Sequence, residues 1–395
     1  MFNITKNISQ RVSRLAYPKI REIFDRAGRY DNVISLGIGE PDFNTDSNII
    51  NQAFQAVIEK NTTHYTPVAG YPELREAIAL NYWKKNRLRV ERDEIIVTHG
   101  AQHALMIAML TILDKGDEVL IPDPYYPSYY VQASLCDAIP VLIPTLEKDN
   151  FKLKAENVIK NISKKSKLII LNTPNNPTGA VLEKDNLEVL SEIIIKNNLM
   201  VIADEAYETM IYDGKTHYCM ASIPGMKERT ITINSFSKSY AMTGWRIGYA
   251  MATKDIISNM MKIGGYHLSC PCAVSQQAAL AALNSSLDII EQMNLEYNKR
   301  RLFFVRELNK IKGISCIKPE GAFYIFANIK NTGRTSEQFY DELLTRAKVV
   351  VIPGSAFGRQ GEGYVRIAYT LSVKKLEEAL TRIKLIFDDE LGLCN

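Results

Sequence analysis

The sequence has few cysteines and histidines, and neither set is spaced as a metal or redox site. Six of its 395 residues are cysteine and five are histidine. Cys270 and Cys272 are separated by a single residue, whereas a redox CxxC pair needs two, and His99 and His103 flank a glycine where a strand gives way to a helix. We therefore expect free thiols in a reducing cytoplasm and no bound metal.

Long apolar segments and runs of one charge are also missing. No stretch approaches the ~18 apolar residues of a membrane span, and residues 1–6 lack the apolar core of a secretion signal. The net charge of +4 is small for this length, and no five like charges adjoin. These absences argue against membranes and nucleic acids as partners. The length instead suits two globular domains.

What the sequence does contain is an alternation of short apolar runs with longer helical patterns. The runs are rich in β-branched residues and apolar on both faces, which is typical of parallel strands covered by helices. Strands are expected at 94–98, 118–122, 141–143, 168–172, 200–204 and 230–234, and helices at 101–113 and 185–197. The alternation predicts an α/β domain.

The pattern of alternating apolar runs and helices changes near residue 288. A long helical pattern rich in charged residues is followed by shorter apolar runs and a closing helix. The expected helices are 288–308 and 373–387, and the expected strands are 322–327, 349–352 and 364–368. This order predicts a second, smaller α+β domain.

Lys238 follows the strand at 230–234 and stands among hydroxyl residues, with Arg246 eight positions further on. That setting suits a lysine that forms an imine beside a phosphate site. Pyridoxal 5'-phosphate (PLP) is held by such a lysine, by an acidic partner for its pyridinium nitrogen and by a phosphate cradle. Asp204, which ends the strand at 200–204, is the candidate acidic partner; alone, it could equally be a solvated helix cap.

Other polar residues follow the expected strands, at the edge where open α/β sheets bind ligands. Asn176 and Tyr207 can hydrogen-bond the phenolate oxygen of the cofactor, although a tight turn would also account for the composition around Asn176. The helix that opens at Gly100 offers free N–H groups to a phosphate. The rest of the expected cofactor contacts are Ala101, Gln102, Ser235, Ser237 and Arg246.

Two more residues have roles that the sequence leaves open. Tyr126 lies between two prolines, where its ring either stacks on the pyridine face or simply packs. Arg366 alternates with apolar residues on the strand at 364–368, so it faces either solvent or a buried anion. Its planar guanidinium suits the α-carboxylate of an amino acid.

These motifs together resemble the class I/II aminotransferases of PLP fold type I, especially the bacterial aspartate and aromatic amino-acid branch. The likeness runs from about Val33 to the last helix. It is carried by segments 35–43 and 65–75, the Asn-Asn-Pro-Thr-Gly turn, the Ser-Phe-Ser-Lys and Gly-Trp-Arg-Ile-Gly-Tyr motifs, and segments 321–324 and 353–358.

The resemblance implies a large PLP-binding domain, residues 45–287, with a mostly parallel seven-stranded sheet between helices. Residues 1–44 and 288–395 would form the smaller domain. It also implies a cytoplasmic homodimer in which Tyr65 reaches the phosphate in the other subunit. Lys238 would be the imine lysine and proton carrier, and Tyr207 would assist at the phenolate. Arg366 would bind the α-carboxylate, aided by Asn176 and the backbone of Gly39.

The implied reaction moves the amino group of an amino acid to a 2-oxo acid such as 2-oxoglutarate, by ping-pong exchange through the Lys238 imine. Aspartate-preferring relatives often carry a lysine for the distal carboxylate where this chain has Gln102, whose neutral amide pairs less well with an anion. We therefore expect an aromatic, neutral or broad-range donor, aspartate included. A PLP-dependent C–S β-lyase and a non-enzymatic PLP-binding regulator are the alternatives.

Overall fold

A seven-stranded sheet is the centre of the larger of two units in the computed structural model, which describes residues 8–13, 15–59 and 62–389. Its strand order is β2-β8-β7-β6-β5-β3-β4, and β8 alone runs antiparallel to its neighbours. The strands are β2 (Ile95–Thr98), β3 (Glu118–Asp123), β4 (Ile139–Pro144), β5 (Ser166–Asn172), β6 (Met200–Asp204), β7 (Thr230–Ser235) and β8 (Gly248–Met251).

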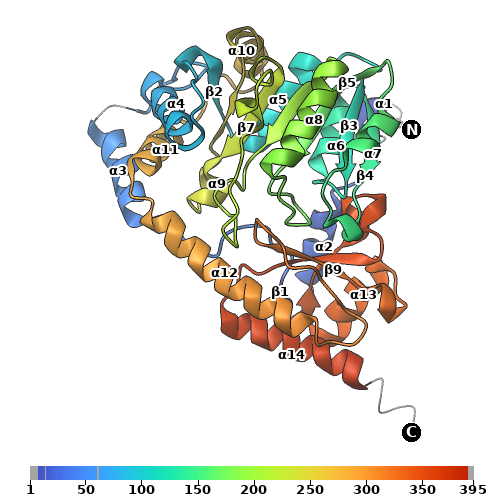
Figure 1. Ribbon diagram of the computed structural model, residues 1–395. Coiled ribbons are helices and arrows are strands. Elements are labelled where there is room, and N and C mark those ends of the chain that lie inside the picture. Colours follow the sequence, from blue (N-terminus) through green and yellow to red (C-terminus); the bar gives the residue numbers. More distant parts are fainter. Residues whose placement is uncertain (1–7, 14, 60–61, 390–395) are drawn as a thin grey trace, which may run out of the picture.

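Helices cover both faces of this sheet (Figure 1). On β5, Leu168 packs in one apolar cluster with Leu105 of a helix, and the next residue, Ile169, packs in another with Leu190. Burial of each such side chain contributes about 1.5–3 kcal/mol to the stability of the fold. The helices are α3 (Ser47–Glu59), α4 (Pro72–Asn86), α5 (Ala101–Ile112), α6 (Ser128–Leu135), α7 (Ala155–Asn161), α8 (Lys184–Lys196), α9 (Phe236–Ser239), α10 (Lys254–Leu268) and α11 (Ala273–Asn284).

The smaller unit contains two short sheets and several helices. Strands β11 (Ile352–Pro353), β12 (Tyr364–Ala368) and β9 (Tyr324–Asn328) form an antiparallel sheet, and β1 (Ile34–Ser35) pairs in parallel with β10 (Val349–Val350). The helices are α1 (Gln10–Ser13), which lies against the larger unit, and α2 (Lys19–Ala27), α12 (Asp288–Leu308), α13 (Ser336–Glu342) and α14 (Val373–Asp389). Figure 1 shows α12 running from the larger unit to α14.

One apolar cluster joins the two ends of the chain. Ile23 of α2 and Leu36 pack with residues of α12, β9, β12 and α14. The predicted α/β architecture with a smaller α+β unit is thus confirmed. The boundaries at 44/45 and 287/288 stay a prediction, and residues 1–7 and 390–395 of the predicted small domain lie outside the described residues.

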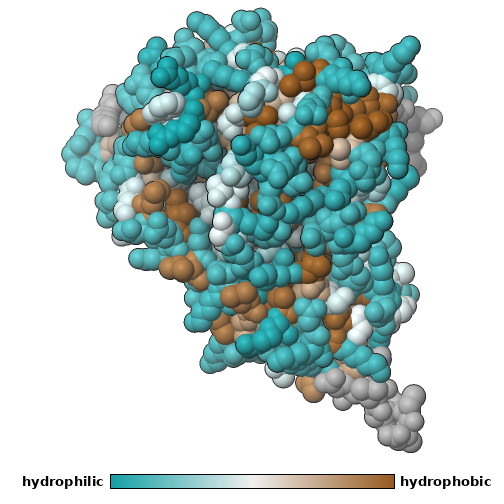
Figure 2. Space-filling view, viewed as in Figure 1, coloured by the Kyte–Doolittle hydropathy of each residue, from teal (hydrophilic) through white to brown (hydrophobic). Residues whose placement is uncertain are grey.

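Two expected strands differ in detail from the structure. The strand expected at 349–352 is divided, because Val350 pairs with β1 whereas Ile352 pairs with β12. The strand expected at 322–327 begins at Tyr324, since Ala322 adopts a left-handed φ of 57° that does not extend a strand. Among the described residues no helix is long and apolar enough to span a bilayer. Figure 2 shows a mostly hydrophilic face with scattered apolar patches.

Candidate active site

Polar residues gather where the parallel strands of the large sheet end. Asn172 ends β5, Asp204 ends β6 and Ser235 ends β7, while β2 leads into Gly100 at the start of α5. Because parallel strands point their carboxyl ends to one edge, these residues share that edge. This is the position that the sequence predicts for the site.

Lys238 lies on α9, immediately beyond β7. Its Nζ donates a hydrogen bond of 2.5 Å to the carbonyl oxygen of Gly39, which belongs to the segment between β1 and α3. Burial lowers the pKa of Lys238 to about 8, and the charge of Glu40 only partly offsets this. The amine is therefore much more easily deprotonated than a surface lysine, as an imine-forming lysine requires.

Asp204 is a buried carboxylate with a donor on each oxygen. Its side chain is 5% exposed. The Tyr129 hydroxyl donates to Oδ2 at 2.6 Å, and the Ala206 N–H donates to Oδ1 at 3.2 Å. Burial raises the pKa of Asp204, and these two hydrogen bonds work in the opposite direction. A cationic ring nitrogen at this place would compensate the buried charge.

Arg366 of β12 is held from several sides. It is 3% exposed, and its guanidinium lies over the rings of Tyr324 and Phe357, 4.5 and 4.9 Å from their centroids. Nη1 donates to the Asn176 side-chain oxygen at 3.1 Å, and Nη2 donates to the Gly37 carbonyl at 2.7 Å. The contact with Asn176 uses its amide oxygen, so the amide nitrogen is the remaining donor of that side chain.

Tyr207 is tied to the same group of residues. Its hydroxyl lies 2.8 Å from the hydroxyl of Tyr324, and burial holds the pKa of Tyr207 well above its usual value. A side chain at Gly39 would place its Cβ 2.6 Å from the Tyr324 hydroxyl. A larger residue at position 39 would therefore force the Tyr324 hydroxyl to move.

Gly100, Ala101 and Arg246 lie together at the start of α5. Gly100 has a φ of 76°, and a Cβ there would lie 2.9 Å from Arg246 Nη2. A Cβ on Gly248 would lie 2.9 Å from the Ala101 nitrogen. The two glycines allow the chain to pack closely here, which brings Arg246 beside the N–H groups of a helix start. An arginine and helix N–H groups together suit a phosphate.

Ser235 and Ser237 complete this region. The Ser235 hydroxyl lies 2.9 Å from the Ser237 hydroxyl and accepts from the Ser237 N–H at 3.0 Å, so it caps α9. Capping explains Ser235 structurally, and it also holds both hydroxyls beside Lys238 on the same short helix.

Gln102 and Tyr126 are in direct contact. The Gln102 amide nitrogen donates to the Tyr126 hydroxyl at 2.5 Å and to the Ser128 hydroxyl at 2.7 Å. Its amide oxygen accepts from the Gln132 side chain at 2.9 Å. Gln102 is thus fixed in orientation against the ring predicted to stack on the cofactor.

Tyr65 is not brought into this cluster within one chain. Its side chain is 90% exposed, which fits a residue that acts elsewhere than in its own subunit. Tyr129 and Tyr324, by contrast, are in the cluster although sequence reasoning missed them. The spacing of Tyr126 and Tyr129, three residues apart at the start of a helix, was the available signal for Tyr129. Tyr324 lies in segment 321–324, one of those that carry the family resemblance, but no pattern in the sequence indicates a role for this tyrosine.

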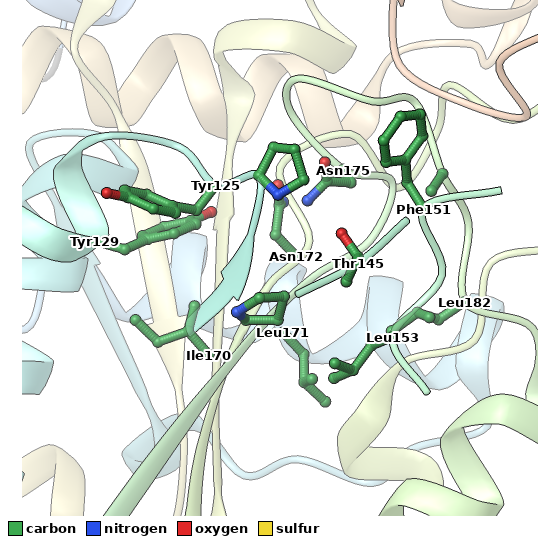
Figure 3. A pocket seen from close by; sticks show the side chains of 13 residues that line it. Tyr125, Tyr129, Thr145, Phe151, Leu153, Ile170, Leu171, Asn172, Asn175 and Leu182 are labelled. Carbon is green, nitrogen blue, oxygen red and sulfur yellow. The ribbon is translucent and has the colours of Figure 1, made fainter. Parts of the chain in front are cut away.

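A cavity lies behind Tyr129 (Figure 3). Tyr125 and Tyr129 stand on one side of it, and Phe151 and Leu182 on the other. Its volume of about 30 Å³ suits a water molecule and is too small for an amino acid. This cavity therefore does not accommodate the substrate, and the open edge at Lys238 and Arg366 is the candidate substrate site.

Glu205, Glu208 and His217 form one group with metal-ligand chemistry. His217 Nε2 lies 3.1 Å from Glu205 Oε2, and the ammonium of Lys85 lies 3.3 Å from Glu208 Oε1. Each carboxylate therefore already has a basic partner from the protein.

Comparisons with known proteins show the family of the chain. The chain matches the family "Aminotransferase class I and II" over residues 31–383. It is 44% identical over 385 residues to an aspartate aminotransferase of Pyrococcus horikoshii, covering 97% of this chain and 98% of that protein. It is 42% identical to aromatic-amino-acid aminotransferase 2 of Thermococcus litoralis, covering 97% and 99%.

A solved structure is similar as well. The aromatic aminotransferase of Pyrococcus horikoshii superposes with a TM-score of 0.89 at 44% identity, covering 93% of this chain and 99% of that one. The chain therefore belongs to the class I and II aminotransferases. It is a PLP-dependent transaminase of fold type I, and the predicted activity and cofactor are confirmed. The buried carboxylate, the amine of lowered pKa and the glycine-lined arginine fit PLP.

Proposed function

We propose that this aminotransferase takes aromatic, neutral or a broad range of amino acids, aspartate included, as donors, with 2-oxoglutarate as acceptor. The observation that carries the proposal is Gln102. It occupies the position beside Tyr126 with a neutral amide whose oxygen and nitrogen are both engaged by the protein. A distal carboxylate gains less from such a group than from an ammonium.

Arg366 is proposed to bind the α-carboxylate that all donors share. Its Nε is buried and has no hydrogen-bond partner among the described residues, so the guanidinium retains an unused donor. The rings of Tyr324 and Phe357 hold the group in plane, which favours a two-point contact with a carboxylate. The Asn176 amide nitrogen would add a further donor.

PLP supplies an electron sink for the charge that develops on Cα of the substrate. In our proposal the Asp204 carboxylate keeps the ring nitrogen protonated, and Tyr207 and Asn176 donate to the phenolate oxygen. Lys238 Nζ takes the Cα proton, a role that its lowered pKa supports because a base must be neutral to accept a proton. Gly100, Ala101, Ser235, Ser237 and Arg246 would hold the phosphate.

A cytoplasmic homodimer is part of the proposal. Tyr65 and Tyr266 expose 90% and 97% of their surface on the single chain. Large exposed aromatic side chains are enriched at protein interfaces, and a second copy would bring Tyr65 to a phosphate. The free thiols of Cys136, Cys219, Cys270, Cys272 and Cys316 fit a reducing compartment.

A panel of amino donors with 2-oxoglutarate tests the donor range. We expect an advantage of aspartate in kcat/KM below about tenfold, worth ~1.4 kcal/mol. Gln102→Lys should shift the preference toward aspartate, while Gln102→Met, neutral and of similar length, should not. Release of pyruvate without any 2-oxo acid would instead indicate lyase activity.

A hundredfold preference for aspartate in the unmutated enzyme would contradict this proposal, because a cation other than residue 102 would then bind the distal carboxylate. An equal shift toward aspartate in Gln102→Met would also contradict it, since loss of the amide network rather than a new charge would be the cause.

A further inference from the structure

Tyr129 occupies the second position of α6 and is 2% exposed. Its backbone N–H donates to the carbonyl of Tyr126 at 3.0 Å, which closes the turn that leads into the helix. The backbone that carries the Tyr129 side chain is therefore fixed, three residues after the Tyr126 ring that is proposed to stack on the cofactor.

The Tyr129 hydroxyl points to the carboxylate of Asp204, with 2.6 Å between the hydroxyl and Oδ2. Burial together with the neighbouring charge of Asp204 raises the pKa of Tyr129 well above its usual value, so the phenol keeps its proton and donates it. The only other hydrogen bond to this carboxylate among the described residues comes from the Ala206 N–H, on Oδ1. Removing the hydroxyl would leave Oδ2 buried without a donor.

The ring of Tyr129 makes a second contact. It meets the Tyr126 ring edge to face, with centroids 5.6 Å apart and an interplanar angle of 83°. The Tyr126 hydroxyl is in turn held by Gln102. One buried side chain thus supports both the carboxylate proposed for the ring nitrogen and the ring proposed to stack on the cofactor.

We propose that Tyr129 is a positioning residue whose hydroxyl sets the orientation of Asp204 and whose ring sets that of Tyr126. The bound PLP ring would then be held at its nitrogen and on its face through one tyrosine. This inference rests on the proposed role of Asp204. It assigns to Tyr129 no contact with the substrate.

The test compares Tyr129→Phe with Tyr125→Phe. Both remove one hydroxyl, and Tyr125 lines the same cavity (Figure 3). Tyr125 donates its backbone N–H to Phe357, and among the described residues its hydroxyl forms no hydrogen bond to the site. PLP affinity is measured by titrating protein stripped of the cofactor, and kcat and KM are measured on the reconstituted enzyme. For Tyr129→Phe we expect PLP affinity and kcat each to fall about tenfold or more, with the donor KM within about threefold, as a lost hydrogen bond to a buried charge predicts.

A double-mutant cycle with Asp204→Asn separates the positioning role proposed for Tyr129 from the role proposed for Asp204. If Tyr129 acts through Asp204, the effect of Tyr129→Phe on PLP affinity largely disappears when Asp204 is already asparagine. Equal losses in both backgrounds would overturn the positioning role, and so would Tyr129→Phe behaving like Tyr125→Phe. Near-normal turnover of Asp204→Asn alone would refute the role of Asp204 itself.

Thermal unfolding checks that the variants fold. If Tyr129→Phe is not recovered folded, Tyr129→His, which retains an aromatic ring with an N–H donor, replaces it in the same titration. We then expect the PLP affinity of Tyr129→His to be closer to that of the parent enzyme than the PLP affinity of Asp204→Asn is. A loss as large as that of Asp204→Asn would overturn the inference.

Discussion

The two ends of the proposed site are built in opposite ways. At the phosphate end, Arg246 is exposed, and its Nη1 donates to the Thr243 carbonyl three residues away. At the carboxylate end, Arg366 is 3% exposed and held by Asn176 and Gly37 and by two aromatic rings. Within one chain, the residues of the first end all belong to the larger unit, whereas the second end combines stretches from both units.

This difference has a physical basis. A phosphate carries close to two charges and can be bound by helix N–H groups and an exposed guanidinium, which loses little hydration. A carboxylate carries a single charge and therefore provides less binding energy. The fold has already desolvated and fixed Arg366 before the substrate binds. We therefore expect the phosphate end to control retention of the cofactor and the carboxylate end to control use of the substrate.

Lys238 connects the two ends, because its backbone follows β7 and its Nζ contacts the carbonyl of Gly39. Lys238→Ala should lower turnover by about 10⁴-fold or more, since both imine formation and proton transfer depend on this amine. PLP should still bind weakly through the remaining contacts. Steady-state assays and absorbance after dialysis check this, and turnover within tenfold of the parent would show that another residue carries the chemistry.

Asp204→Asn should have the next largest effect. In our proposal Asp204 contacts the PLP ring, which lies between the two ends. Loss of the carboxylate would remove the proposed partner of the PLP ring nitrogen, which should lower kcat by about 10²- to 10³-fold, as for other preorganised electrostatic contacts. Pre-steady-state rates with a single donor measure the effect on the proton-transfer step. An unchanged rate would show that the charge at 204 does not support the reaction.

Exchanging each arginine for lysine tests the comparison directly. Arg366→Lys should lower kcat/KM for all donors by roughly 10²-fold with PLP affinity nearly unchanged, because lysine lacks the planar fork. Arg246→Lys should instead weaken PLP binding and leave the donor KM close to that of the parent enzyme. If both variants changed the same parameter, the division of labour between the ends would be wrong.

The smallest expected effect concerns pH. Burial lowers the pKa of Lys238 to about 8. At pH 7 about a tenth of the amines would then be neutral, against under about 0.1% for an ordinary lysine. In protein stripped of the cofactor, imine formation with PLP should therefore accelerate about tenfold per pH unit below pH 8 and level off above it. Stopped-flow absorbance measures this, and a rate still rising at pH 10 would contradict the lowered pKa.

Much of the fold could be predicted because its central strands are apolar on both faces. Strands β5, β6 and β7 lie within a residue or two of the expected ranges at 168–172, 200–204 and 230–234. Residues that follow such strands meet at one edge, so Asp204 and Lys238 could be placed near each other without coordinates. The start of α5 at Ala101 was expected from the apolar helical pattern that follows Gly100.

Other features depend on contacts that no local pattern encodes. Strand β8 has four residues and runs against its neighbours, and nothing in its sequence gives that direction. The bond from Tyr129 to Asp204 joins residues 75 positions apart. Arg366 could be assigned to solvent or to an anion, and only the packing of Tyr324 and Phe357 around it shows that it is buried.

The place of β8 in the sheet also bears on synthesis of the chain. Among the strands of the described residues, β2 pairs with β8 alone, so residues 95–98 have no strand partner until residues 248–251 have left the ribosome. Until then both β2 and the open side of β7 are unpaired edges, which are prone to wrong association. The segment that carries Lys238 and Arg246 connects β7 to β8, so we expect the proposed phosphate site and the protected sheet edge to form together.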